Sequence, residues 1–264
     1  MPDPVPNPLH HVRRGTGAPL VLIHGLGSSW ANWLPVFDRL AAKREVIAID
    51  LPGFGASAPL RGPVTMATLT EAVEQFLRDT GLENADLAGS SMGARLVLEM
   101  ARRGHEGSVV ALDPGGFWSP GQRAVFGATV GASIRLIRAL DGALPALTGS
   151  RIARSALLFQ FSARPWALDP EVVLTELRGF NRAASIDEAL DALVHGPTQP
   201  GALRTKGRVA IGWGRQDRVT LPSQASVAIE RFPNARFRGF HHCGHYPHWD
   251  QPEQAARFIL SATA

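Results

Sequence analysis

One five-residue turn, Gly89–Gly93 with the sequence Gly-Ser-Ser-Met-Gly, constrains the fold of this chain more than any other stretch. Residues 85–88 before it are typical of a short buried strand, and residues 94–101 after it are typical of a helix. Glycine at both ends of the turn avoids a collision between a side chain and the neighbouring strand or helix. We expect the Ser91 hydroxyl to stand clear of the backbone at a helix N-terminus, which favours negative charge.

Three further segments that carry polar groups each follow a strand-like stretch. They are the His-Gly-Leu-Gly loop 24–27 after residues 19–23, Asp217 after residues 208–214, and His245 after residues 235–240. Their order along the chain is glycine-containing loop, serine, acid, histidine. That order, with each residue just past a strand, resembles the α/β-hydrolase family.

The resemblance extends over nearly the whole chain. Residues 50–57 match the D-x-P-G-x-G-x-S loop of this family, and residues 212–217 resemble its acid loop. Residues 244–247, followed by Gln-Pro-Glu at 251–253, resemble its histidine loop. Only residues 114–200 lack a family-wide motif, and the family places its variable cap there.

The alternation of strand-like and helical stretches predicts the same fold as the resemblance does, a mostly parallel sheet covered by helices on both faces. The alternation stops after Asp113 and resumes at Arg208. We therefore expect an α/β fold with a mostly parallel, doubly wound sheet, in which residues 1–113 and 201–264 form the core and residues 114–200 form an inserted helical cap. Ligands of open α/β sheets bind beyond the carboxyl ends of the strands, so the cap is expected above the site.

The resemblance implies a catalytic triad of Ser91, Asp217 and His245. A serine hydroxyl is a poor nucleophile at neutral pH, and it needs both a base and a group that orients the base. The resemblance assigns these two roles to His245 and Asp217. It also implies that the backbone N–H groups of Leu26 and Met92 form an oxyanion hole.

Each triad role has a rival in the sequence. Ser90 fits the nucleophile poorly, because the positions two residues away on either side would then not be glycine. Asp113 also follows a strand, and some members of this fold carry the acid there, so it stays an alternative to Asp217. His245 is favoured as the base because it alone follows glycine in a Gly-His-x-Pro pattern. The other candidate histidines are His241, His242 and His248.

Composition excludes several other classes of protein. The 264 residues suit one large α/β domain, and the single cysteine excludes an intramolecular disulfide. The net charge of +4 comes without a basic run interleaved with aromatic residues, so we expect no nucleic-acid binding. We find no metal-ligand cluster and expect neither a metal nor a cofactor. Residues 1–8 lack the apolar segment of a signal peptide, and no run is apolar enough to span a bilayer, so we expect a cytoplasmic protein without stable membrane insertion.

The predicted cap is rich in aromatic side chains, some of which we expect to form an apolar substrate pocket near Ser91. The candidates for this pocket are Phe117, Trp118, Phe159 and Trp166. Residues 114–168 also contain six arginines against one aspartate. We expect a solvated basic face, and the alternative is attraction to a substrate carboxylate or to an anionic lipid surface.

The resemblance implies a serine hydrolase that cleaves small-molecule carboxylic esters with small to medium apolar groups through an acyl-enzyme. Serine at position 91 excludes the relatives that form an alkyl ester on aspartate, such as haloalkane dehalogenases and epoxide hydrolases. The alternatives within the same fold are a carbon–carbon bond hydrolase acting on ring-cleavage diketo acids, or a lactonase or perhydrolase. A ligand receptor or silent scaffold is the alternative from a different class.

Overall fold

The computed structural model describes residues 9–264, so the expectation about a signal peptide at residues 1–8 lies outside the described residues. Within the described residues, one sheet of seven strands has the order β1-β3-β2-β4-β5-β6-β7. The strands are β1 (His11–Arg14), β2 (Pro19–Ile23), β3 (Glu45–Ile49), β4 (Asp86–Ser90), β5 (Val109–Leu112), β6 (Val209–Gly214) and β7 (Arg236–Phe240). Strand β1 pairs antiparallel with β3, and all the other neighbouring pairs are parallel. The predicted mostly parallel α/β sheet is therefore confirmed.

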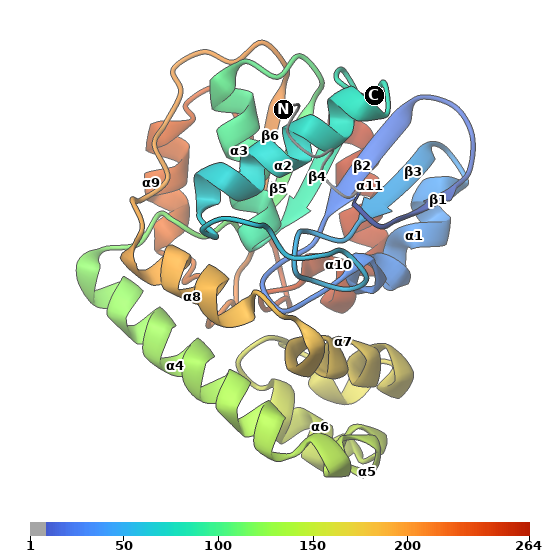
Figure 1. The fold of residues 1–264 in the computed structure, drawn as a ribbon, viewed down its shortest axis with the longest axis vertical. Coiled ribbons are helices and arrows are strands. Elements are labelled where there is room, and N and C mark those ends of the chain that lie inside the picture. The colour runs from blue at the N-terminus through green and yellow to red at the C-terminus, as the bar shows by residue number, and fades with distance from the viewer. Residues whose placement is uncertain (1–8) are drawn as a thin grey trace.

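Helices cover both faces of this sheet (Figure 1). The helices around the sheet are η1 (Trp30–Trp33), α1 (Leu34–Ala41), α2 (Met66–Asp79), α3 (Met92–Arg103), α9 (Gln224–Arg231), α10 (Pro247–Asp250) and α11 (Pro252–Ala262). Alternate side chains of a central strand enter two separate apolar clusters. In β2, Leu20 and Leu22 pack in the cluster with α1 and α11, whereas Val21 and Ile23 pack in the cluster with α2 and α3. Burial on both faces explains why the central strands are apolar almost without interruption.

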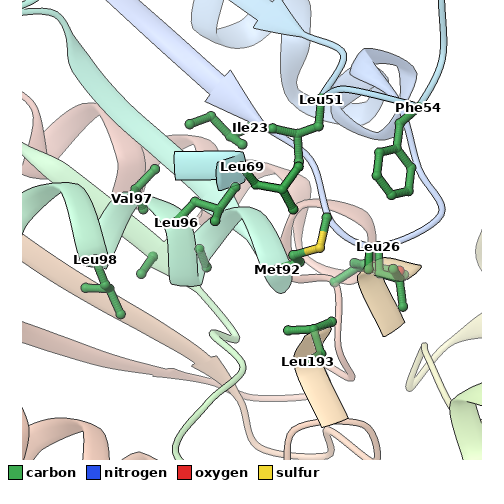
Figure 2. Close-up of a cluster of buried hydrophobic side chains, with 14 of the residues drawn as sticks. Ile23, Leu26, Leu51, Phe54, Leu69, Met92, Leu96, Val97, Leu98 and Leu193 are labelled. Atoms are coloured by element: carbon green, nitrogen blue, oxygen red, sulfur yellow. The ribbon is translucent and has the colours of Figure 1, made fainter. Parts of the chain in front are cut away.

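Helix α3, which begins at Met92, is buried along most of its length and fixes the turn that carries Ser91. Figure 2 shows Met92 and the α3 residues after it within a cluster of apolar side chains from other elements. The labelled members are Ile23, Leu26, Leu51, Phe54, Leu69, Met92, Leu96, Val97, Leu98 and Leu193. Close packing holds α3 in one position relative to the sheet, so the serine is held in one position as well.

Between β5 and β6 the described chain contains helices and no strand. These helices are α4 (Pro120–Ala139), η2 (Asp141–Ala143), α5 (Leu144–Gly149), α6 (Arg151–Leu158), η3 (Pro165–Ala167), α7 (Pro170–Arg182) and α8 (Ile186–His195). The long helix α4 begins where Ser119 and Gln122 form a reciprocal capping box, with Pro120 in the first turn. Helices α4 to α7 lie beyond one end of the sheet, where the cap was expected (Figure 1).

The described helices include none that is long and apolar enough to cross a membrane.

Candidate active site

The turn between β4 and α3 has the strained geometry that its sequence predicts. Ser91 has φ 55° and ψ −112°, a backbone conformation that non-glycine residues rarely adopt. A Cβ atom at Gly89 would collide with the carbonyl oxygen of Gly93, and a Cβ atom at Gly93 would collide with that of Ile23. The Ser91 N–H is held by the carbonyl oxygen of Leu112 at 2.9 Å. The two glycines are therefore required by the neighbouring backbone, and the side chain of Ser91 projects from a fixed point.

The structure brings the three predicted triad residues together from three loops of the sheet. His245 Nε2 lies 2.8 Å from Ser91 Oγ, and His245 Nδ1 lies 2.8 Å from Asp217 Oδ2. The side chains of His245 and Asp217 are almost completely buried. The His245 N–H also donates to the carbonyl oxygen of Phe161 at 2.7 Å, so the segment between α6 and α7 holds the histidine loop. The order of these hydrogen bonds is that of a Ser-His-Asp triad.

The Asp217 carboxylate is held by its own loop as well as by the histidine. Oδ1 accepts the N–H groups of Val219 and Thr220 at 2.7 and 3.1 Å. Oδ2 accepts the hydroxyl of Thr220 at 2.6 Å. These donors fix the carboxylate in the orientation in which it faces the histidine ring. Thr220 was not predicted, and nothing in its sequence context distinguishes it from other loop threonines.

The alternative acid, Asp113, lies close to the triad but is not bonded to its histidine. Asp113 Oδ1 accepts the Gly214 N–H at 2.8 Å. Burial and the neighbouring Asp217 carboxylate raise the pKa of Asp113 well above its ordinary value. A raised pKa disfavours the charged carboxylate that stabilises an imidazolium, and His245 Nδ1 bonds Asp217 rather than Asp113, so the structure favours Asp217 as the acid.

Among the described residues, one group of side chains has the spacing of metal ligands. It consists of Asp113, Asp217 and His245. One donor atom from each lies within 4.8 Å of the others. Both oxygens of Asp217 and the Nδ1 atom of His245 are already engaged in the hydrogen bonds above. A metal ion here would have to displace those bonds, so the arrangement suits a hydrogen-bonded triad better than a metal centre.

The segments that carry the two predicted oxyanion donors lie beside Ser91. A Cβ atom at Gly25 would contact the Ser91 side chain, which places the loop containing Leu26 beside Ser91. Within residues 9–264, neither the Leu26 N–H nor the Met92 N–H donates to a protein acceptor. The Met92 N–H is in the first turn of α3, where helix N–H groups have no partner within the helix. Both donors are therefore available to an oxyanion formed at Ser91.

His24 supports this loop and does not face the reaction centre. Its Nε2 accepts the Leu51 N–H at 3.0 Å, so the ring proton is on Nδ1, which donates to the Gly25 carbonyl oxygen at 2.7 Å. His248 is also structural. It is buried in α10, and its Nε2 bonds Asn32 Oδ1 at 2.6 Å, far away in the chain. The sequence offered His248 only as a rival to His245, and its bond to Asn32 was not predicted.

A small apolar cavity of about 20 Å³ lies against the serine and the histidine. This volume holds about one water molecule. The lining residues are Leu26, Ser91, Phe126, Val130, Phe161, Phe180, Val219, His245 and Tyr246. Six of them, from α4, α7 and the loops beside the triad, were not among the site residues predicted from the sequence, because their spacing alone does not say what they face.

The four aromatic residues predicted to form the pocket lie elsewhere. Phe117 is buried in the core, where its ring packs edge-on against Trp213. Trp118 stacks on Phe126 and lies behind that lining residue. Phe159 and Trp166 are 61% and 53% exposed. Apolar residues were expected to face Ser91 because they lie in the cap, but the direction of each side chain depends on how its helix packs.

Glu176 in α7 connects the region between β5 and β6 to the oxyanion loop, and the sequence analysis missed it. Its Oε2 accepts the Ser28 hydroxyl and its Oε1 accepts the Asn32 side-chain amide, both at 2.9 Å. Complete burial raises the pKa of Glu176 to about 7. The available signal was a charged residue at helical spacing within the apolar face that includes Val173, Leu177 and Phe180.

The raised pKa of Glu176 predicts that the protein loses stability as the pH rises. Above its ordinary pKa of 4.5 the unfolded chain releases this proton, while the folded protein keeps it up to about 7. The resulting loss of folding free energy grows from pH 4.5 to 7 and amounts to about 3 kcal/mol. Glu176→Gln removes the titration, so the variant should unfold at a higher temperature than the wild type above pH 7. Thermal unfolding followed by circular dichroism from about pH 5 to pH 8 tests this, and equal pH dependence in both proteins would contradict it.

The fold agrees with comparisons to known proteins. The model of the family described as "Alpha/beta hydrolase family" matches residues 20–258. This chain therefore belongs to the α/β-hydrolase family.

Individual relatives differ in the activities that their names state. The chain is 32% identical over 250 residues to the dihydrolipoyllysine-residue acetyltransferase component of an acetoin cleaving system from Cupriavidus necator, covering 90% of this chain but only 61% of that protein. It is 30% identical over 258 residues to a 2-hydroxymuconate semialdehyde hydrolase from a Pseudomonas strain, covering 92% of this chain and 85% of that protein. A solved thermophilic esterase from Thermogutta terrifontis superposes with a TM-score of 0.75 at 21% identity, covering 96% and 92% of the two chains. This last similarity supports the fold alone.

Proposed function

We propose that this chain is a serine hydrolase that cleaves carboxylic esters with short apolar acyl groups. The observation that carries the proposal is the apolar cavity between Ser91 and the residues of α4 and α7. Its lining, within residues 9–264, includes no arginine or lysine that could bind a substrate carboxylate. An uncharged acyl group suits such a lining, because burying an unpaired carboxylate there would be costly.

The reaction follows from the hydrogen-bonded chain of the site. Ser91 Oγ attacks the ester carbonyl carbon while His245 Nε2 takes the hydroxyl proton. The oxyanion of the tetrahedral intermediate accepts the N–H groups of Leu26 and Met92. His245 then gives the proton to the leaving alcohol as the carbon–oxygen bond breaks, which leaves an acyl group on Ser91. A water molecule, deprotonated by His245, hydrolyses the acyl-enzyme, and Asp217 stabilises the imidazolium in both steps.

The small volume of the cavity predicts a preference for short acyl groups. We expect kcat/KM for p-nitrophenyl esters to be highest for acetate or propionate and to fall as the acyl chain lengthens, because a longer chain must displace the packed rings of Phe126, Phe161 and Phe180. Steady-state rates across the ester series test this. Rates that rise steadily to octanoate or beyond would contradict the proposed short acyl site.

The second candidate is a carbon–carbon bond hydrolase acting on ring-cleavage diketo acids. It is supported by the relative named 2-hydroxymuconate semialdehyde hydrolase, which is 30% identical to this chain. Its substrate class is anionic, and the uncharged lining of the cavity weighs against it. A ring-cleavage diketo acid assayed beside the ester series separates the two functions. Turnover of the diketo acid with a higher kcat/KM than any ester would replace the first proposal with the second.

The arginines of α4 test whether an anionic substrate is recognised. Arg138 pairs with Asp187 of α8 at the surface, at 3.0 Å, which suits a solvated face. We therefore expect replacement of both Arg135 and Arg138 by glutamine to change KM only weakly, and equally for a neutral ester and a carboxylate-bearing ester of similar size. Assays at low and physiological ionic strength measure this. A selective rise in KM for the charged ester, shrinking with salt, would instead assign these arginines to substrate binding.

A further inference from the structure

A second buried carboxyl group, Asp113, lies beside the acid of the triad and has no part in the reaction described above. It follows β5 directly, and it is fully buried. Its Oδ1 atom accepts the Gly214 N–H, whereas its Oδ2 atom receives no hydrogen bond from a donor within residues 9–264. A buried carboxylate oxygen without a donor is costly, so the state of this atom needs an explanation.

A proton on Oδ2 explains both the missing donor and the position of the side chain. A protonated carboxyl group is itself a donor and requires an acceptor. The side chain of Asp217 is within reach as that acceptor, and donor atoms of Asp113, Asp217 and His245 lie within 4.8 Å of one another. The Gly214 N–H continues to donate to the unprotonated Oδ1 atom. Every polar atom of Asp113 then has a partner.

The charges around Asp113 also favour its neutral form. The titratable groups that face it are Asp217 after β6, His245 and Cys243 after β7, and Asp250 in α10. Burial raises the pKa of the Cys243 thiol, so this group adds no charge. No arginine or lysine within the described part of the chain stabilises a carboxylate at Asp113. The acidic neighbours and the burial therefore both favour the protonated form of Asp113.

We infer that Asp113 is a positioning residue, which keeps its proton at neutral pH and donates a hydrogen bond from Oδ2 to the Asp217 carboxylate. The inference rests on the proposed serine mechanism. The proton stays on Asp113 throughout the reaction, so the pair carries one negative charge. Asp113 thereby adds a donor to those from Val219 and Thr220 and keeps the Asp217 carboxylate directed at His245 Nδ1.

Two substitutions separate a neutral donor from a charged group. Asp113→Asn imitates the protonated acid, because its carbonyl oxygen can accept the Gly214 N–H while its amide donates to Asp217. Asp113→Ala removes both bonds. The readout is the rate constant for covalent labelling of Ser91 by a fluorophosphonate, which requires the triad but does not depend on the natural substrate. We expect Asp113→Asn to keep a rate close to that of the wild type, and Asp113→Ala to lose about ten- to a hundredfold, as for a lost bond to a charged group.

The pH profile of the labelling rate supplies a readout that a merely structural role would not change. In the wild type we expect a decline at alkaline pH, as Asp113 ionises and places a second charge against Asp217. The Asn variant should lack this decline, and the acid limbs of the two profiles should coincide. If Asp113 were a carboxylate at neutral pH, the Asn variant would instead shift its acid limb to lower pH by about two units, because His245 would lose a stabilising charge.

The outcomes also separate this inference from the proposed function. Labelling of the wild type at Ser91 with equal rates and equal pH profiles for both variants would overturn the role of Asp113 alone. A displaced acid limb in Asp113→Asn would overturn its neutral state. Absence of labelling in the wild type would overturn the serine mechanism, and the inference with it.

Discussion

Ser91→Ala should lower kcat/KM for a short-chain ester by about 10⁶, the scale on which the loss of a triad serine reduces turnover in other serine hydrolases. The substitution removes the only atom of Ser91 that bonds His245, and it adds no bulk to the turn. Helix α3 and the two glycines of the turn should keep the backbone in place, so the melting temperature should change little. Steady-state kinetics and thermal unfolding of the same preparation measure both effects.

The neighbouring serine provides a matched control. Ser90 is buried at the end of β4, and its hydroxyl has no hydrogen-bond partner within residues 9–264. Ser90→Ala should therefore leave kcat/KM close to that of the wild type. Substantial ester turnover by Ser91→Ala, or a larger loss from Ser90→Ala than from Ser91→Ala, would end the assignment of Ser91 as the nucleophile.

Asp217→Asn should lower kcat by about 10⁴, the effect of holding a triad histidine in the wrong tautomer. The Asn side-chain oxygen can still accept the N–H groups of Val219 and Thr220, so the loop should keep its shape. The side-chain amide would then face His245 Nδ1 as a donor, and that nitrogen could no longer carry the proton that it donates to Asp217. Kinetics with a short-chain ester and a thermal unfolding curve test the loss of rate without loss of fold.

Asp113→Asn is the comparison that decides between the two aspartates. Its effect on kcat should be far smaller, because Asp113 makes no bond to the histidine and its neutral form is imitated by the amide. A reversal of the two effects would show that the acid follows β5 and that the assignment of Asp217 is wrong. Equal losses of about 10⁴ would show that the carboxyl pair orients the histidine as a unit.

Much of the fold and the arrangement of the candidate site could be predicted from the sequence, because both depend on local patterns. The glycines of the serine turn are required by backbone contacts that only a strand followed directly by a helix creates. The central strands of the sheet are buried on both faces, so their sequences are apolar and their ends can be recognised. Ser91, Asp217 and His245 each follow a strand, and the resemblance to the α/β-hydrolase family implied that they form a triad. In the structure, His245 lies 2.8 Å from Ser91 and from Asp217.

Only the tertiary structure decided which side chains surround the triad. Phe126 and Phe161 line the cavity while Phe159 and Trp166 face solvent, although all four are aromatic residues of one helical region. The rotation of each helix about its axis depends on packing against distant elements, which no local pattern encodes.

Only the tertiary structure decided the surroundings of the buried carboxyl groups as well. Glu176 bonds Ser28 across 148 positions of the chain, and Asp113 reaches Asp217 because β5 and β6 are neighbours in the sheet. The sequence alone determined the turn, the sheet and the order of the site residues, because these follow from spacing and from backbone sterics. The raised pKa values of Asp113 and Glu176 and the size of the cavity depend on burial and on contacts between distant segments, and these exist only once the chain has folded.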